Sequence, residues 1–61
     1  MRGDYIHKGN LLTYTVLGEC KIKDEVTREW VPGILYHKNG DTFVRTIKDF
    51  EENFIKVESG E

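Results

Sequence analysis

The chain has 61 residues, of which 33% are charged, and its net charge at pH 7 is −2. This length allows one small domain, residues 1–61, because a domain of about 60 residues buries only about 60% of its unfolded surface. The chain has nine Lys and Arg residues against eleven Asp and Glu residues. This balance excludes a nucleic-acid-binding protein that acts through bulk positive charge. The composition as a whole excludes a disordered chain.

The cysteine content and the N-terminal residues bear on the compartment. Cys20 is the only cysteine, so an intramolecular disulfide cannot form, and we expect a reducing, cytoplasmic location. The first twenty residues mix charged and polar side chains and contain no apolar run typical of a signal peptide or a membrane span. We therefore expect no membrane association, and we expect residues 58–61 to form a loose tail.

Two strands are expected in the first half of the chain. Asp4–His7 predicts a short strand, which ends at the polar segment Lys8–Asn10. From Leu12 to Lys23 apolar and polar residues alternate, as in a long half-buried strand. Leu17 and Gly18 interrupt the alternation, which favours a bulge or sharp bend at that point.

The segment after Lys23 allows two interpretations. Asp24–Thr27 predicts a turn, followed by a strand from Arg28 to His37. The alternative is a short helix from Asp24 to Trp30, but Pro32 and Gly33 follow too closely for it to run far. Because proline donates no hydrogen bond, we expect Pro32 at a sheet edge or in a bulge.

The stretch YHKNGDTFVR, residues 36–45, predicts a hairpin. Asn39-Gly40 is typical of a two-residue type I′ turn, which places Lys38 opposite Asp41. The pairs that follow are His37 with Thr42, Tyr36 with Phe43, Leu35 with Val44, and Ile34 with Arg45. With Leu35 and Val44 in the core, the side chains of Tyr36, Phe43 and Arg45 point outward; a slip of one residue would exchange the faces.

The end of the chain completes the fold class. Residues 47–54 predict one helical turn with Asp49 as the N-cap, and Ile55–Val57 predicts a closing strand. The expected fold is all-β: a small, strongly bent, SH3-like five-stranded barrel with a helical turn before the last strand. The expected core is Leu12 or Leu17, Tyr14, Val16, Cys20, Ile22, Leu35, Val44, Phe50, Phe54 and Ile55.

The segments GDYIHKG, YTVLG, LYHKNGDTFVR and DFEENF resemble a family of short bacterial and phage proteins to which no function is assigned. The resemblance spans residues 3–57 and implies an SH3-type barrel but no activity. Thr46 stands where the family usually has proline, and Pro32-Gly33 replaces an aromatic–basic pair. If that pair contacts a ligand in the family, the resemblance implies weaker or different binding here. Family-like positions are Gly3, Tyr5, His7, Gly9, Tyr14, Val16, Leu17, Gly18, Leu35, Tyr36, Val44 and Arg45.

The candidate binding site is the aromatic–arginine face, which consists of Tyr36, Phe43 and Arg45. Aromatic rings beside an arginine suit planar or anionic ligands, such as bases, carboxylates or peptide side chains. We expect the residues bordering this face to be Tyr5, His7 and Trp30. The alternative is that Tyr36 and Phe43 are a cross-strand pair covering a thin sheet, with Arg45 over them.

The chain carries no motif for catalysis or metal binding. His7, His37 and Cys20 could ligate zinc, but their spacing matches no zinc motif, and Cys20 lies among the apolar positions of its strand. We therefore expect no metal, no cofactor and no enzymatic activity.

The predicted function is a non-enzymatic module that binds a protein or peptide. The alternatives are a nucleic-acid or nucleotide-binding barrel and a phage-encoded inhibitor of a host factor. Homo-oligomerisation also stays open, because domains this small often gain stability by association.

Overall fold

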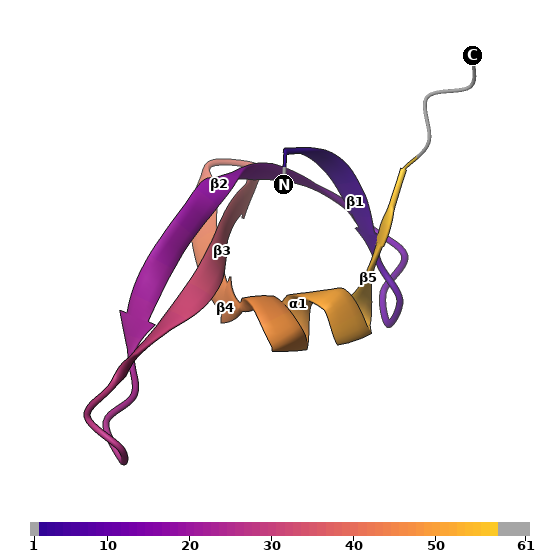
Figure 1. Ribbon diagram of the computed structural model, residues 1–61. Coiled ribbons are helices and arrows are strands. Elements are labelled where there is room, and N and C mark those ends of the chain that lie inside the picture. The colour runs from indigo at the N-terminus through magenta and orange to yellow at the C-terminus, as the bar shows by residue number, and fades with distance from the viewer. Residues whose placement is uncertain (1, 58–61) are drawn as a thin grey trace.

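The structure is a computed structural model that describes residues 2–57; the predicted tail, residues 58–61, lies outside them. The chain forms β1 (Gly3–His7), β2 (Thr13–Lys23), β3 (Trp30–Lys38), β4 (Asp41–Thr46), α1 (Ile47–Asn53) and β5 (Phe54–Lys56) (Figure 1). The five predicted strands and the helix before the last strand are confirmed, with bounds that differ by no more than two residues.

The five strands form one antiparallel sheet in the order β4-β3-β2-β1-β5. The sheet curves strongly, and α1 lies across its concave side between the two edge strands, β4 and β5 (Figure 1). These edges do not pair with each other, so the five strands form an open, arched sheet that does not close into a barrel. The seven residues between β4 and β5 form α1.

The predicted β3–β4 hairpin is confirmed. Asn39 and Gly40 both have positive φ, 52° and 86°, as a type I′ turn requires. The register is the predicted one, from Lys38 opposite Asp41 to Ile34 opposite Arg45. A turn that needs two left-handed residues fixes this register, because few residue pairs other than Asn-Gly adopt it readily.

The faces of this hairpin are the reverse of those predicted. Ile34 is fully buried and Tyr36 is 4% exposed, whereas Val44 is 46% exposed and Leu35 is only half-buried. The outward placement of the aromatic–arginine face was therefore wrong. Its side chains point to the concave side of the sheet, which α1 covers.

A bulge in β2 explains part of the error. The register between β2 and β3 shifts between Val16 and Gly18, so Leu17 is an extra residue. Because side chains alternate along a strand, one extra residue exchanges the two faces beyond it. Val16 faces the core, but Cys20 and Ile22, which continue the same even-numbered pattern, face the other way.

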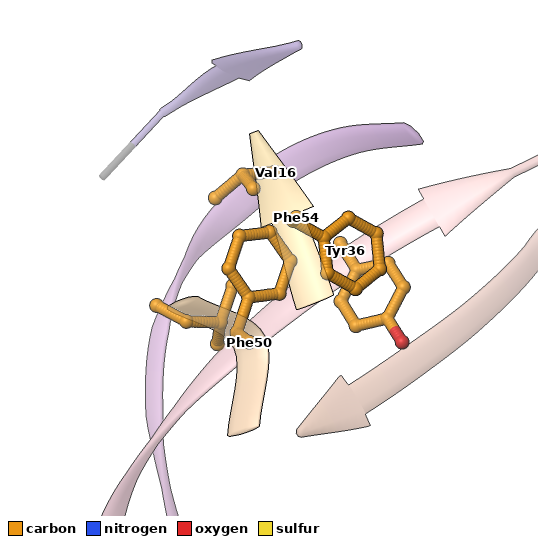
Figure 2. Close-up of a cluster of buried hydrophobic side chains, with 5 residues drawn as sticks. Val16, Tyr36, Phe50 and Phe54 are labelled. Carbon is orange, nitrogen blue, oxygen red and sulfur yellow. The ribbon is translucent and has the colours of Figure 1, made fainter. Parts of the chain in front are cut away.

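The core is a compact group under the arch (Figure 2). Its buried members are Val16, Ile34, Tyr36, Phe50 and Phe54. The rings of Phe50 and Phe54 stack with their centroids 4.2 Å apart, and each also meets Tyr36 edge-on. The prediction was correct for Val16, Phe50 and Phe54, and Tyr14 packs against them. It was wrong for Leu12, Leu17, Val44 and Ile55, which are exposed, and for Cys20, Ile22 and Leu35, which lie half-buried on the opposite face.

The start of α1 is capped by Thr46. Its Oγ1 accepts a hydrogen bond of 3.1 Å from the backbone N–H of Asp49. The predicted cap, Asp49, lies inside the first turn, where a negative charge favours the positive end of the helix. The same position brings the Asp49 carboxylate to Arg45, so the shifted helix start also creates an ion pair.

The distal ends of β2 and β3 project from the sheet as a two-stranded arm, residues 21–32 (Figure 1). The pairing of β1 with β2 stops at Val16, and that of β4 with β3 stops at Gly33, so only these two strands continue. Pro32 lies in this uncovered part of β3, as its missing N–H predicted. Residues 24–29 form a loop and not a helix.

The turn of the β3–β4 hairpin provides a first testable prediction. We expect Gly40→Ala to lower the free energy of unfolding by about 1–2 kcal/mol, because an L-residue is strained at its φ of 86°. Gly18→Ala is the matched control, since Gly18 lacks a positive φ and has open space around it. Urea unfolding of both variants measures the difference. Equal losses would contradict the left-handed turn.

Candidate binding surface

The residues of the aromatic–arginine face pack within the folded domain. Tyr36 and Phe43 stack with their ring centroids 5.4 Å apart, as a cross-strand pair. Phe43 keeps 39% of its surface exposed, whereas Tyr36 is almost wholly enclosed. The alternative interpretation from the sequence, an aromatic pair that covers the sheet, describes this arrangement better, except that Tyr36 belongs to the core itself.

Arg45 connects the hairpin to the helix. Its Nε donates a 2.8 Å hydrogen bond to the Tyr36 hydroxyl, and its Nη1 lies 2.9 Å from Oδ2 of Asp49. The guanidinium also sits 5.4 Å from the centre of the Phe54 ring. The hydrogen bond to Tyr36 is the main cause that raises the pKa of Arg45, although partial burial acts in the opposite direction. Two of the donor nitrogens are thus engaged within the chain, which leaves Arg45 poorly placed to receive an anionic ligand.

Tyr5 and His7 border the core from β1. The Tyr5 ring meets Phe50 edge-on at 5.0 Å, and the His7 ring meets Phe54 edge-on at 4.8 Å. Nδ1 of His7 accepts hydrogen bonds from the backbone N–H groups of Gly9 and Asn10. Both rings are half-buried and engaged in packing.

Trp30 is placed apart from the other predicted site residues. It lies six residues before Tyr36 in β3, which corresponds to about 20 Å along a strand. Its side chain is 62% exposed, and the Lys23 ammonium lies 5.9 Å from the centre of the indole ring. The structure therefore brings Tyr36, Phe43 and Arg45 together and separates Trp30 from them.

The residues around Trp30 form a surface that the sequence analysis missed. In the register of β2 and β3, Lys23 is opposite Trp30 and Lys21 is opposite Pro32. Opposite residues in an antiparallel pair share a face, and residues two apart in a strand share it as well. We name this set of four the tryptophan face. A signal was present in the sequence: alternation puts Trp30 and Pro32 on one side of the strand.

The tip of the arm is held by Asp24. Its Oδ1 accepts hydrogen bonds from the backbone N–H groups of Val26 and Thr27, at 2.8 and 3.2 Å. Its backbone N–H donates to the carbonyl of Glu29, and its carbonyl accepts from Arg28. These bonds close the loop and fix the ends of both strands, so Trp30 is presented from an ordered hairpin.

A groove of about 280 Å³ runs beside the tryptophan face. Val31, Pro32 and Ile47 supply its apolar wall. Thr46, Lys48 and Asp24 complete the lining. The groove lies where β4 gives way to α1 and leaves the edge of β3 uncovered, so it can receive a side chain from outside.

The residues that the structure describes contain neither a candidate metal site nor a helix that could span a membrane. Among residues 2–57, no group of three or more His, Cys, Asp and Glu side chains is placed to hold a metal ion, and the candidate ligands His7, His37 and Cys20 are not brought together. Within the same residues, no helix is long and apolar enough to pass through a membrane.

Comparison of the chain with known protein families, with curated proteins and with solved structures finds no match. The resemblance to short bacterial and phage proteins therefore stays a prediction. The fold itself defines the class as a small, mostly antiparallel β domain with one short helix and a projecting two-stranded arm.

Proposed function

We propose that the chain is a non-enzymatic module that binds a segment of another protein through the tryptophan face. The exposure of Trp30 carries the proposal. A tryptophan exposed at 62% leaves a large apolar surface in water, and tryptophan is among the residues that dominate protein-binding energies.

The charges around Trp30 indicate the chemistry of the partner. Lys21 and Lys23 are exposed on the same face as Trp30, and Lys48 lines the groove together with Pro32. Two lysines on the face of the indole ring and a third in the groove suit a segment that carries acidic side chains next to an apolar one. The apolar side chain would pack on Trp30 or enter the groove, while its carboxylates pair with the lysines.

A nucleic acid is the second candidate, because bases stack on exposed indole rings and lysines contact phosphates. The short extent of the positive charge opposes it, since Lys21 and Lys23 are the two basic residues of the tryptophan face. A phosphate backbone needs a continuous basic track, and the whole chain has a net charge of −2.

An inhibitor of a host factor would be one form of the protein-binding function. A reducing, cytoplasmic location belongs to the same proposal, because Cys20 is the only cysteine.

Selection of a random peptide library on the intact chain tests this function. We expect enriched peptides to combine Asp or Glu with an aromatic or leucine residue. Trp30→Ala should weaken their binding by about 30-fold, which corresponds to about 2 kcal/mol for an interface anchor. Calorimetry measures the affinity of the parent and of Trp30→Ala alike. In the parent, the fluorescence of Trp30, the only tryptophan, reports binding as well.

Ile55→Ala is the matched control, because Ile55 is similarly exposed, at 55%, on a distant strand. It should leave binding unchanged. Peptides that bind Trp30→Ala as tightly as the parent would contradict the proposal. A random single-stranded DNA pool is the second probe, and binding that requires Trp30 and falls steeply with salt would favour the nucleic-acid candidate.

A further inference from the structure

The outer face of the sheet, opposite α1, carries an apolar surface that we name the outer patch. It consists of Cys20, Ile22, Val31, Leu35 and Val44. Ile22 is opposite Val31, and Leu35 is opposite Val44, so these side chains are adjacent across three strands. Val44 is 46% exposed and the others are half-buried, and α1 covers only the other side of the sheet.

The centre of the outer patch lacks a side chain of its own at Gly33. The side chain of Ile22 lies across this glycine, so that a Cβ built on Gly33 would be 2.6 Å from Ile22 Cδ1. Cys20 is directly opposite Gly33. Ile22 thus covers the backbone at Gly33 and keeps the surface apolar at this point.

This face is also free of charge along β2, β3 and β4. By register and alternation its positions from Thr15 to Thr46 are Thr15, Gly18, Cys20, Ile22, Val31, Gly33, Leu35, His37, Thr42, Val44 and Thr46. None is Asp, Glu, Lys or Arg, although 33% of the chain is charged. At the β1 side, the Thr15 hydroxyl donates to the Asp4 carboxylate, where the charge-free region ends.

We propose that the outer patch binds a second copy of this chain in a two-fold symmetric dimer. In such a dimer the same patch meets itself, so any charged residue near the axis would face its own like charge. A charge-free apolar surface avoids this repulsion, and homodimer interfaces are more apolar than others. The threonines and His37 around the patch form the polar rim that an interface needs.

A dimer of standard size would cover only part of the surface of this domain. A standard interface takes about 800 Å² from each partner, which is roughly a fifth of the 4500 Å² surface of this domain. The dimer would leave Trp30 free, since Trp30 and Val31 are adjacent in β3 and point to opposite sides, but it would cover Val31, which also lines the groove. Dimerisation would thus present two arms on one particle.

Sedimentation equilibrium of the full chain under reducing conditions tests the dimer. From about 10 µM to about 1 mM, the range in which weak interfaces associate, the mass should rise toward twice that of the chain. Val44→Glu should weaken association at least about 10-fold, because a carboxylate would be buried without a partner. A parent chain that stays monomeric throughout would overturn the proposal.

Leu11→Glu is the matched control, because Leu11 is 73% exposed in the loop between β1 and β2, away from the outer patch. It should associate like the parent. Circular dichroism confirms that Val44→Glu folds, and a folded Val44→Glu that associates undiminished would also overturn the proposal. If Val44→Glu does not fold, the parent's NMR dilution series decides. Concentration-dependent shifts should fall on Ile22, Leu35 and Val44, and shifts centred on Trp30 would instead indicate association through the arm.

Discussion

Phe50→Ala is expected to unfold the domain. Phe50 has no exposed surface, and its ring contacts Tyr5, Tyr36 and Phe54 at centroid distances of 5.0, 5.4 and 4.2 Å. Removing a buried phenylalanine costs about 3–5 kcal/mol, through lost transfer energy and the cavity left behind. A domain of this size has only about 3–5 kcal/mol of net stability. Far-UV circular dichroism at room temperature should therefore show loss of most of the folded signal.

Phe43→Ala is the matched control, since it removes the same side chain from a position that is 39% exposed. It loses one stacking contact with Tyr36 and an edge contact with Tyr14, and we expect a loss of about 1 kcal/mol. The variant should stay folded with a lower midpoint of thermal unfolding. A Phe50→Ala variant that melts like Phe43→Ala would contradict the position of Phe50 at the centre of the core.

The hairpin shows why strand pairing could be predicted from the sequence while its orientation could not. Asn39-Gly40 determines the register through backbone geometry alone. The choice of face depends on which side is more apolar, and both sides carry large apolar residues. Ile34 and Tyr36 compete with Leu35 and Val44, and nothing within the hairpin separates the two pairs.

The bulge at Leu17 also made the alternation of apolar residues along β2 misleading about which face of the sheet is buried. Gly18 predicted an irregularity, and the structure has one between Val16 and Gly18. The sequence does not show whether a residue is inserted there or the strand only bends. An inserted residue exchanges the faces, so Val16 and Cys20, four residues apart in an apparently regular pattern, lie on opposite sides.

For a related reason, the sequence analysis did not identify the tryptophan face as the candidate binding surface. An arginine beside aromatic residues suggested an outward surface, because isolated charges are rarely buried. Arg45 lies at the concave side because Tyr36 and Asp49 supply partners, and Asp49 was expected to cap the helix instead. Trp30 was assigned to the border of that face, whereas the extension of β2 and β3 beyond their neighbours carries it away on the arm.

Arg45→Ala is expected to lower the free energy of unfolding by about 1–3 kcal/mol, the cost of leaving a buried polar group without its partner. The group in question is the hydroxyl of Tyr36, a residue that is 4% exposed as a whole, and this hydroxyl accepts its hydrogen bond from Arg45 Nε. The variant also loses the ion pair with Asp49. Because its pKa is raised, Arg45 stabilises the fold fully at every pH below the ordinary arginine pKa, and the effect is lost only as the pH rises through the higher folded value. Urea unfolding at neutral pH therefore measures it.

A double-mutant cycle with Tyr36→Phe separates this hydrogen bond from the rest of the arginine. With the hydroxyl removed, Arg45→Ala no longer leaves a buried acceptor unsatisfied, so the two losses should be less than additive by about 0.5–3 kcal/mol. Lys48→Ala is the control, because Lys48 is exposed at the start of the same helix and should change stability by less than about 0.5 kcal/mol. Strict additivity of Tyr36→Phe and Arg45→Ala would show that the arginine acts on stability only through Asp49 and its packing on Phe54. A coupled pair would establish Arg45 as a connection between the β3–β4 hairpin and α1, and therefore as a residue that acts on the stability of the fold.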